Sequence, residues 1–249
     1  MHQRFTGKRC LVTGAASGLG RATSLRLAAE GGRVVCLDLA DAVEETAAVI
    51  AAAGGDALVV TSSVSDPAQV EGAVTRAVAH LGGLDVLCNV AGVLRMEHTE
   101  SSSIDTWNLV IGVNLTGTYL MARHALPHLI ESKGNIVNVG SSAGLRGHAY
   151  AAAYCASKGG VIHLTKELAE EFKAAGVRAN VVCPGGMATP MVGNLEIPDD
   201  IEMRLLLKHT SPMGECTPDQ VASTVAFLAS DEADYITGAV VSVDGGITV

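Results

Sequence analysis

Tyr154 and Lys158 lie four residues apart in the segment YCASK, in a chain that has only 4 tyrosines. Four residues advance an α-helix by about 400°, so a helix here would place both side chains on one face. A phenol beside an ammonium can serve as a general acid or base, because the positive charge stabilises the phenolate. The pair is therefore a candidate for proton transfer, although an ordinary half-buried helix pair would show the same spacing.

The electrostatic requirement of this pair can be stated in numbers. A free phenol has a pKa of about 10, and bringing it towards 7 requires about 4 kcal/mol in favour of the phenolate. An ammonium about 4 Å away supplies an interaction of that size at an effective dielectric constant of about 20. We therefore expect Lys158 to lower the pKa of Tyr154.

A glycine pattern near the N-terminus, TGAASGLG, runs from Thr13 to Gly20 between an expected strand and an expected helix. Gly14 and Gly18 permit a tight turn, and the N–H groups at a helix start bind a pyrophosphate. This context favours a dinucleotide site over a simple turn, although the spacing is GxxxGxG and not the commoner GxGxxG.

Asp38 ends the next expected strand, RVVCLD, about 20 residues beyond the glycines, where an acidic residue binds the adenosine ribose of NAD. The same carboxylate would repel a 2′-phosphate, and no Lys or Arg stands beside it. The sequence therefore predicts NAD in preference to NADP. The simpler interpretation is that Asp38 only begins a loop.

Short β-branched runs alternate with Ala-rich helical stretches along the chain. The runs are apolar nearly throughout, which predicts a parallel sheet covered on both faces. We expect a single domain over residues 1–249, an α/β Rossmann-like doubly wound fold with a seven-stranded parallel sheet. The expected strands are CLVTG, RVVCLD, ALVVTS, DVLCNVAG, NIVNVGS, RANVVCPG and AVVSVDGG, and the expected helices begin near Gly18, Asp41, Asp66, Thr106, Ala151 and Thr217. A proline-rich segment, about 184–217, follows the end of the sixth strand and is expected to be a substrate loop.

Composition excludes several classes of protein. The 249 residues carry a formal net charge of -9, which argues against a nucleic-acid or anionic-membrane partner. The 6 cysteines are isolated and no apolar run could span a bilayer, so we expect a cytoplasmic protein. His124 and His128 have metal-ligand spacing, but Pro127 lies between them and no third ligand is evident, so no metal site is expected.

Several motifs occur together in a characteristic order. They are the GxxxGxG turn, NVAG at Asn89–Gly92, Asn114, Ser141, the Tyr154 and Lys158 pair, PGGMAT, and the ending DYITGAVVSVDGG. In these motifs the sequence resembles the short-chain dehydrogenase/reductase family over essentially its whole length. The resemblance implies an NAD(P)-dependent oxidoreductase that transfers hydride between the cofactor and a small-molecule alcohol or ketone.

The resemblance also implies roles for four residues. Tyr154 would be the general acid/base, and Lys158 would stabilise its phenolate and bind the nicotinamide ribose. Ser141 would hydrogen-bond the substrate oxygen, since its spacing to the tyrosine fits better than that of Ser142. Asn114 would hold a water that links Lys158 to solvent.

Further cofactor contacts follow from the same resemblance. One departure is Ser63, which stands where relatives often have an Asp that contacts adenine. The backbone of Val64 would have to make this contact to adenine instead. The implied cofactor-binding residues are Gly14, Ser17, Gly18, Leu19, Gly20, Asp38, Ser63, Val64, Asn89, Ala91, Gly92, Tyr154, Lys158, Pro184, Gly185, Met187 and Thr189. Relatives are commonly homotetramers, which pair the helices expected around 106–130 and 151–175.

The substrate is less well defined. Arg95, Arg146 and His148 could meet an anionic group, but most candidate pocket residues are apolar and suit a secondary alcohol or ketone with an apolar body. These candidates are Val93, Leu94, Ala143, Leu145, Tyr150, Gly186, Met191, Val192 and Leu195. The leading interpretation is an NAD-dependent alcohol dehydrogenase. A 3-oxoacyl-thioester reductase and a non-catalytic NAD-binding sensor are the alternatives.

Overall fold

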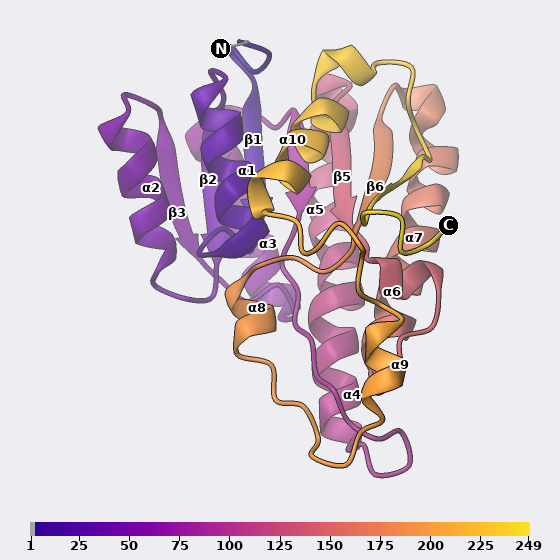
Figure 1. Ribbon diagram of the computed structural model, residues 1–249. Coiled ribbons are helices and arrows are strands. Elements are labelled where there is room, and N and C mark those ends of the chain that lie inside the picture. Colours follow the sequence, from indigo (N-terminus) through magenta and orange to yellow (C-terminus); the bar gives the residue numbers. More distant parts are fainter. Residues whose placement is uncertain (1–2) are drawn as a thin grey trace.

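The computed structural model describes residues 3–249, which form seven parallel strands in one sheet, in the order β3-β2-β1-β4-β5-β6-β7 (Figure 1). This is the predicted doubly wound α/β sheet. The interior strand β5 is buried along its whole length, and its two polar residues, Asn135 and Asn138, each donate a side-chain hydrogen bond, to Ala229 O and Thr165 Oγ1. The strands are β1 (Arg9–Thr13), β2 (Arg33–Asp38), β3 (Ala57–Thr61), β4 (Val86–Asn89), β5 (Asn135–Val139), β6 (Arg178–Pro184) and β7 (Val240–Val243).

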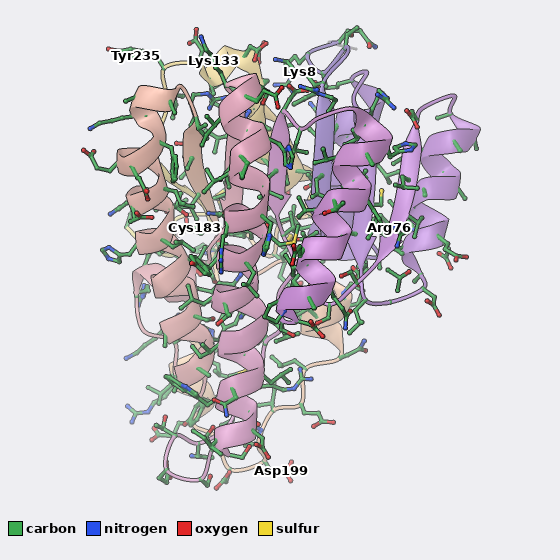
Figure 2. The ribbon with its side chains drawn as sticks, turned by 180° about the vertical axis from the view of Figure 1, so that it is seen from behind. Lys8, Arg76, Lys133, Cys183, Asp199 and Tyr235 are labelled. Carbon is green, nitrogen blue, oxygen red and sulfur yellow. The ribbon has the colours of Figure 1, made fainter. Side chains whose placement is uncertain are left out.

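Helices cover both faces of the sheet and form a separate apolar core on each. On one face α1, α2 and α10 pack over the strands (Figure 1), and on the other α3, α5 and α7 lie side by side (Figure 2). The helices are α1 (Gly18–Ala29), α2 (Val43–Ala52), α3 (Pro67–Leu81), α4 (Ile104–Ile111), α5 (Gly117–Ser132), α6 (Ser142–Leu145), α7 (Ala152–Phe172), α8 (Pro190–Gly193), α9 (Met203–Leu207) and α10 (Pro218–Ala229).

Several residues at which we expected helices to begin are N-caps in the structure. Asp66 precedes α3 and accepts hydrogen bonds from the backbone N–H groups of Ala68 and Gln69. Thr217 precedes α10 in a capping box with Gln220. The helix expected near Thr106 is α4, which begins at Ile104 after the cap Ser103.

The expected substrate loop lies at the carboxyl ends of the strands. The predicted loop after β6 contains two short helices, α8 and α9, which lie beyond this edge of the sheet (Figure 1). Figure 2 shows Asp199, between these two helices, at the opposite end of the molecule from Lys8, Lys133 and Tyr235. We refer to residues 190–209 as the lid. Within residues 3–249 no helix is both long and apolar enough to cross a membrane.

Candidate active site

The glycine-rich turn between β1 and α1 depends on the absence of side chains. Gly14 and Gly18 have φ of 71° and 49°, which other residues rarely adopt. A Cβ at Gly14 would lie 2.9 Å from the backbone of Ala91, and one at Gly20 would collide with the carbonyl oxygen of Gly14. The turn therefore lies directly against the end of β4, with the start of α1 facing the space beyond it.

The first turn of α1 keeps its donors available. Ser17 is the N-cap with extended backbone, but its hydroxyl makes no capping hydrogen bond. The first N–H groups of a helix have no partners within it, and together with the helix dipole they attract an anion. Ser17 and this helix start line a cavity, so both can meet a phosphate.

Asp38 joins the end of β2 to the glycine turn. One carboxylate oxygen accepts a hydrogen bond from Ala16 N at 2.9 Å, and the other accepts one from Ala40 N at 3.0 Å. Asp38 lines the same cavity as the glycines. Ser63 lies nearby, with its hydroxyl 3.0 Å from that of Ser65.

The expected catalytic residues come from two adjacent elements. Ser141 follows β5 and caps α6, where its hydroxyl accepts a hydrogen bond from Ala143 N at 3.1 Å. Tyr154 and Lys158 lie on the first turns of α7, as the spacing predicted. A Cβ at Gly144 would lie only 2.7 Å from the carbonyl carbon of Lys158, so this glycine allows α6 to pack onto α7.

The ammonium of Lys158 is buried beside the ring of Tyr154. Its Nζ lies 5.7 Å from the ring centroid and donates a 2.8 Å hydrogen bond to the carbonyl oxygen of Val139. Burial lowers the pKa of Lys158 to about 8, so it is mostly charged at neutral pH.

The expected lowering of the Tyr154 pKa is not found in the protein alone. Removal from water raises the pKa of the phenol, and the Ser141 hydroxyl opposes that rise only in part. The Lys158 ammonium, which donates its hydrogen bond to Val139 O, does not offset this desolvation. Tyr154 is therefore a protonated phenol at neutral pH.

Asn114 lies in a single π-helical turn, Gly112–Thr116, between α4 and α5. Its amide accepts a hydrogen bond from Val93 N at 2.8 Å and donates to Val93 O at 2.9 Å and to Ser157 Oγ at 3.1 Å. Ser157 in turn donates to the carbonyl oxygen of Tyr154 at 2.8 Å. The side chain of Asn114 thus ties the chain after β4 to the turn of α7 that carries Tyr154. Such π-turns are frequent at functional sites.

Gly160 permits close packing of α7 against the π-helical turn. A Cβ there would lie 2.7 Å from the side chain of Leu115, which belongs to the π-turn. Gly159 is less constrained, because a Cβ there would meet its nearest atom only at 3.7 Å.

One cavity of about 540 Å³ connects these parts. It brings together the expected residues Gly14, Ser17, Gly18, Leu19, Gly20, Asp38, Ser63, Val64, Ala91, Gly92, Ser141, Tyr154, Lys158, Pro184, Gly185, Met187 and Thr189. Asn89 and Asn114 do not line it. Asn89 is buried at the end of β4, where its side chain donates a hydrogen bond to Asn138 Oδ1 at 2.9 Å, and its expected contact with the cofactor stays a prediction.

The substrate end of the cavity is mostly apolar, as expected, but some lining residues differ. Leu145, Tyr150, Arg95 and Arg146 are not part of it. Residues that the sequence did not single out are Met96, Leu109, Val113, Ala151, Pro190 and His209. Leu109 and Val113 lie four residues apart, so a helix that leads to Asn114 would place both on one face. This spacing is a signal that could have been found. His209 gave none, because it lies far along the chain from the other lining residues.

Comparisons with known proteins agree with this arrangement. The family model described as Enoyl-(Acyl carrier protein) reductase matches residues 14–248. The chain is 42% identical to 2,5-dichloro-2,5-cyclohexadiene-1,4-diol dehydrogenase of Sphingobium indicum, covering 100% of this chain and 99% of that protein. It is 41% identical to meso-2,3-butanediol dehydrogenase of Serratia marcescens, covering 98% and 96% of the two chains.

A solved structure shows the same likeness in three dimensions. The crystal structure of a short chain dehydrogenase from Mycobacterium paratuberculosis bound to NAD superposes with a TM-score of 0.93 at 30% identity, covering 98% of this chain and 99% of that one. The fold and the relatives agree over nearly the full length. The chain therefore belongs to the short-chain dehydrogenase/reductase family of NAD(P)-dependent oxidoreductases.

Proposed function

We propose that the protein is an NAD-dependent oxidoreductase that interconverts a secondary alcohol and a ketone, with Tyr154 as general acid/base. The observation that supports this most directly is the single cavity, which joins Asp38 and the glycine turn at one end to Ser141, Tyr154 and Lys158 at the other. The two relatives described above are both named as dehydrogenases of diols, which are alcohols.

The cavity fits a dinucleotide in its chemistry. The free donors at the start of α1 suit a pyrophosphate, and the carboxylate of Asp38 suits the hydroxyls of an adenosine ribose. Lys158 and Thr189 would hold the nicotinamide end. When bound, the dinucleotide supplies a nicotinamide ring that accepts or gives up hydride.

The catalytic residues of the chain handle the proton of the substrate. Ser141 orients the substrate oxygen by a hydrogen bond, and Tyr154 Oη gives it a proton during ketone reduction or takes one during alcohol oxidation. Lys158 keeps a positive charge close to the phenol ring, which favours the phenolate when oxidation requires it. The protonated phenol of the protein alone is the form needed for reduction.

Asn114 acts mainly as a positioning residue in this proposal. Its side-chain amide is hydrogen-bonded to Val93 and Ser157. The backbone carbonyl oxygen of Asn114 is therefore the group that would hold a water near Lys158. That carbonyl already accepts a 2.7 Å hydrogen bond from Thr118 Oγ1 and has a second lone pair for such a water.

The preference for NAD rests on the negative charge of Asp38. Replacing Asp38 with Ala should lower the ratio of kcat/KM for NAD to that for NADP by about tenfold or more, because a 2′-phosphate would no longer meet a like charge. Steady-state kinetics with both cofactors and one alcohol would measure this ratio.

A matched control is Asp41→Ala. Asp41 is exposed, lies three residues further along and does not line the cavity. This variant removes the same charge from the surface and should keep the ratio of the wild type. An unchanged ratio in Asp38→Ala would mean that another residue distinguishes the two cofactors.

The reaction can be tested with a panel of secondary alcohols and ketones. The full chain would be mixed with NAD or NADH and with steroid, alicyclic, sugar-derived and acyl-thioester substrates, and NADH absorbance would be followed. We expect turnover of alicyclic or small acyclic alcohols. Preferred reduction of an oxoacyl thioester with NADPH would instead favour the biosynthetic alternative, and NADH binding without any turnover would favour a sensor.

We also propose that the protein is a homotetramer. Apolar side chains remain exposed along α4 and α5, including Ile104 at 70% and Tyr119 at 46% exposure, and association of these helices would cover them. Analytical ultracentrifugation showing a monomer at micromolar concentration would contradict this proposal.

A further inference from the structure

Two imidazole rings face each other at the substrate end of the cavity. His148 comes from the segment between α6 and α7, and His209 follows α9 in the lid. Their ring centroids lie 3.9 Å apart with an angle of 23° between the planes, so the rings are stacked. Both line the cavity, whose remaining wall at this end is apolar.

The protein uses the hydrogen-bonding capacity of this pair only in part. His209 Nδ1 is buried and has no hydrogen-bond partner within residues 3–249. His148 Nδ1 lies 3.1 Å from the carbonyl oxygen of Ala149, so it is the protonated nitrogen and Nε2 remains an acceptor. A buried polar atom without a partner is costly, and a ligand that supplies the missing hydrogen bond removes that cost.

His209 is uncharged at neutral pH. Burial lowers the pKa of His209 to about 4, and the neighbouring His148, Arg146 and Lys208 act in the same direction. A neutral imidazole suits a hydroxyl or carbonyl oxygen of the ligand better than an anion.

The arginines that could have received an anionic group are directed elsewhere. Arg95 donates to Leu94 O at 2.8 Å, and Arg146 donates to Ile247 O near the end of the chain at 2.6 Å. Among the described residues that line the cavity, Lys158 is the sole lysine or arginine, and it lies at the catalytic end. The substrate end therefore lacks a fixed positive charge.

Contacts between the lid and the rest of the chain fix the position of His209. Glu202 N donates to Tyr150 Oη at 2.9 Å, and His98 Nε2 lies 2.9 Å from Asp200 Oδ1. The rings of His98 and Tyr150 meet edge to face at 5.0 Å. Tyr150 has φ of 64°, a strained conformation for a residue with a side chain, which these contacts maintain. Tyr150 thus anchors the lid, although the sequence suggested a pocket wall.

We propose that His148 and His209 bind a second oxygen of an uncharged substrate, so that the substrate is a diol or hydroxyketone with a small apolar body. This inference rests on the proposed function, because one oxygen must lie at Ser141 and Tyr154 while the other reaches the imidazoles. The buried Nδ1 of His209 and the apolar surroundings support it.

The test compares molecules that differ by one oxygen. The full chain with NAD would be assayed with cyclohexanol, with the 1,2-, 1,3- and 1,4-cyclohexanediols, and with 4-hydroxycyclohexanecarboxylate. We expect kcat/KM for at least one diol to exceed that for cyclohexanol by about tenfold after correction for its two hydroxyls. The carboxylate should be a poorer substrate than that diol.

The variant His209→Phe retains a flat ring that can stack but cannot hydrogen-bond through nitrogen. Its ratio of kcat/KM for the preferred diol to that for cyclohexanol should fall towards one, with a rise in KM for the diol. His148→Phe should act in the same direction, and retained NADH binding would show that both variants fold. Lys208→Gln is the control, since Lys208 is exposed and does not line the cavity, and it should keep the ratio of the wild type.

Each outcome separates this inference from the proposed function. Oxidation of cyclohexanol as fast as any diol, a preference for the carboxylate, or an unchanged ratio in both histidine variants would overturn the inference and leave an alcohol dehydrogenase. Failure of every alcohol and ketone with both cofactors would overturn both.

Discussion

Replacing Tyr154 with Phe should lower kcat for alcohol oxidation by about 10³-fold, within the range that general acid/base catalysis contributes. The substitution removes one hydroxyl and keeps the ring, which lies 5.7 Å from Lys158 Nζ. Dinucleotide affinity should change little, because Asp38 and the start of α1 bind the other half of the cofactor. Steady-state kinetics and NADH fluorescence would measure the two quantities.

The pH dependence of the wild type should reflect the same phenol. Burial raises the pKa of Tyr154, so only a small fraction is phenolate at neutral pH. Oxidation requires this base form, and its rate should rise with pH through the alkaline range. Reduction requires the phenol and should not rise. In Tyr154→Phe the residual oxidation should lose this dependence.

The matched control for this substitution is Tyr235→Phe. Tyr235 is 99% exposed and lies at the end of the molecule opposite the lid (Figure 2), so losing its hydroxyl should leave both kcat and the pH profile unchanged. A Tyr154→Phe enzyme with wild-type kcat would exclude Tyr154 as the acid/base.

Local patterns in the sequence were sufficient for the fold and for much of the cavity. The glycine turn, Asp38, and the Tyr154 and Lys158 pair depend on residues close together in the chain, where turn geometry and helical spacing fix their arrangement. The parallel sheet followed from apolar runs that alternate with helices.

Features that depend on distant residues could not be predicted in this way. His148 and His209 stack although they lie 61 positions apart in the chain. Arg146 is directed away from the cavity by a backbone carbonyl near the chain end, and Asn89 by a partner on the neighbouring strand. The raised pKa of Tyr154 likewise depends on burial, which spacing does not reveal.

Replacing Lys158 with Met should reduce activity and increase stability at neutral pH. A positive charge 5.7 Å from the ring of Tyr154 contributes about 3 kcal/mol towards the phenolate at an effective dielectric constant of about 20. Its loss should therefore slow alcohol oxidation by about 10²-fold. Steady-state kinetics at saturating NAD would measure this loss. Saturating NAD separates it from any change in cofactor binding, because Lys158 also lies where the nicotinamide ribose would bind.

The gain in stability follows from the cost of burying the ammonium. Burial lowers the pKa of Lys158 from 10.5 to about 8, so the charged form costs about 3 kcal/mol of folding free energy below pH 8. Met avoids that cost but leaves Val139 O without its donor, which returns about 1–2 kcal/mol. Urea unfolding at pH 7 should therefore show Lys158→Met to be more stable by about 1–2 kcal/mol.

The sign of this effect can be checked by changing pH. The unfolded chain binds more protons than the folded one between pH 8 and 10.5, so wild-type stability rises over that window relative to the variant, and the advantage of Met should disappear. Lys166→Met is the control, because Lys166 is exposed on the same helix and should change neither activity nor the unfolding midpoint appreciably. If Lys158→Met were less stable than the wild type at pH 7, the buried ammonium would be stabilising the fold, which would contradict the cost inferred from its lowered pKa.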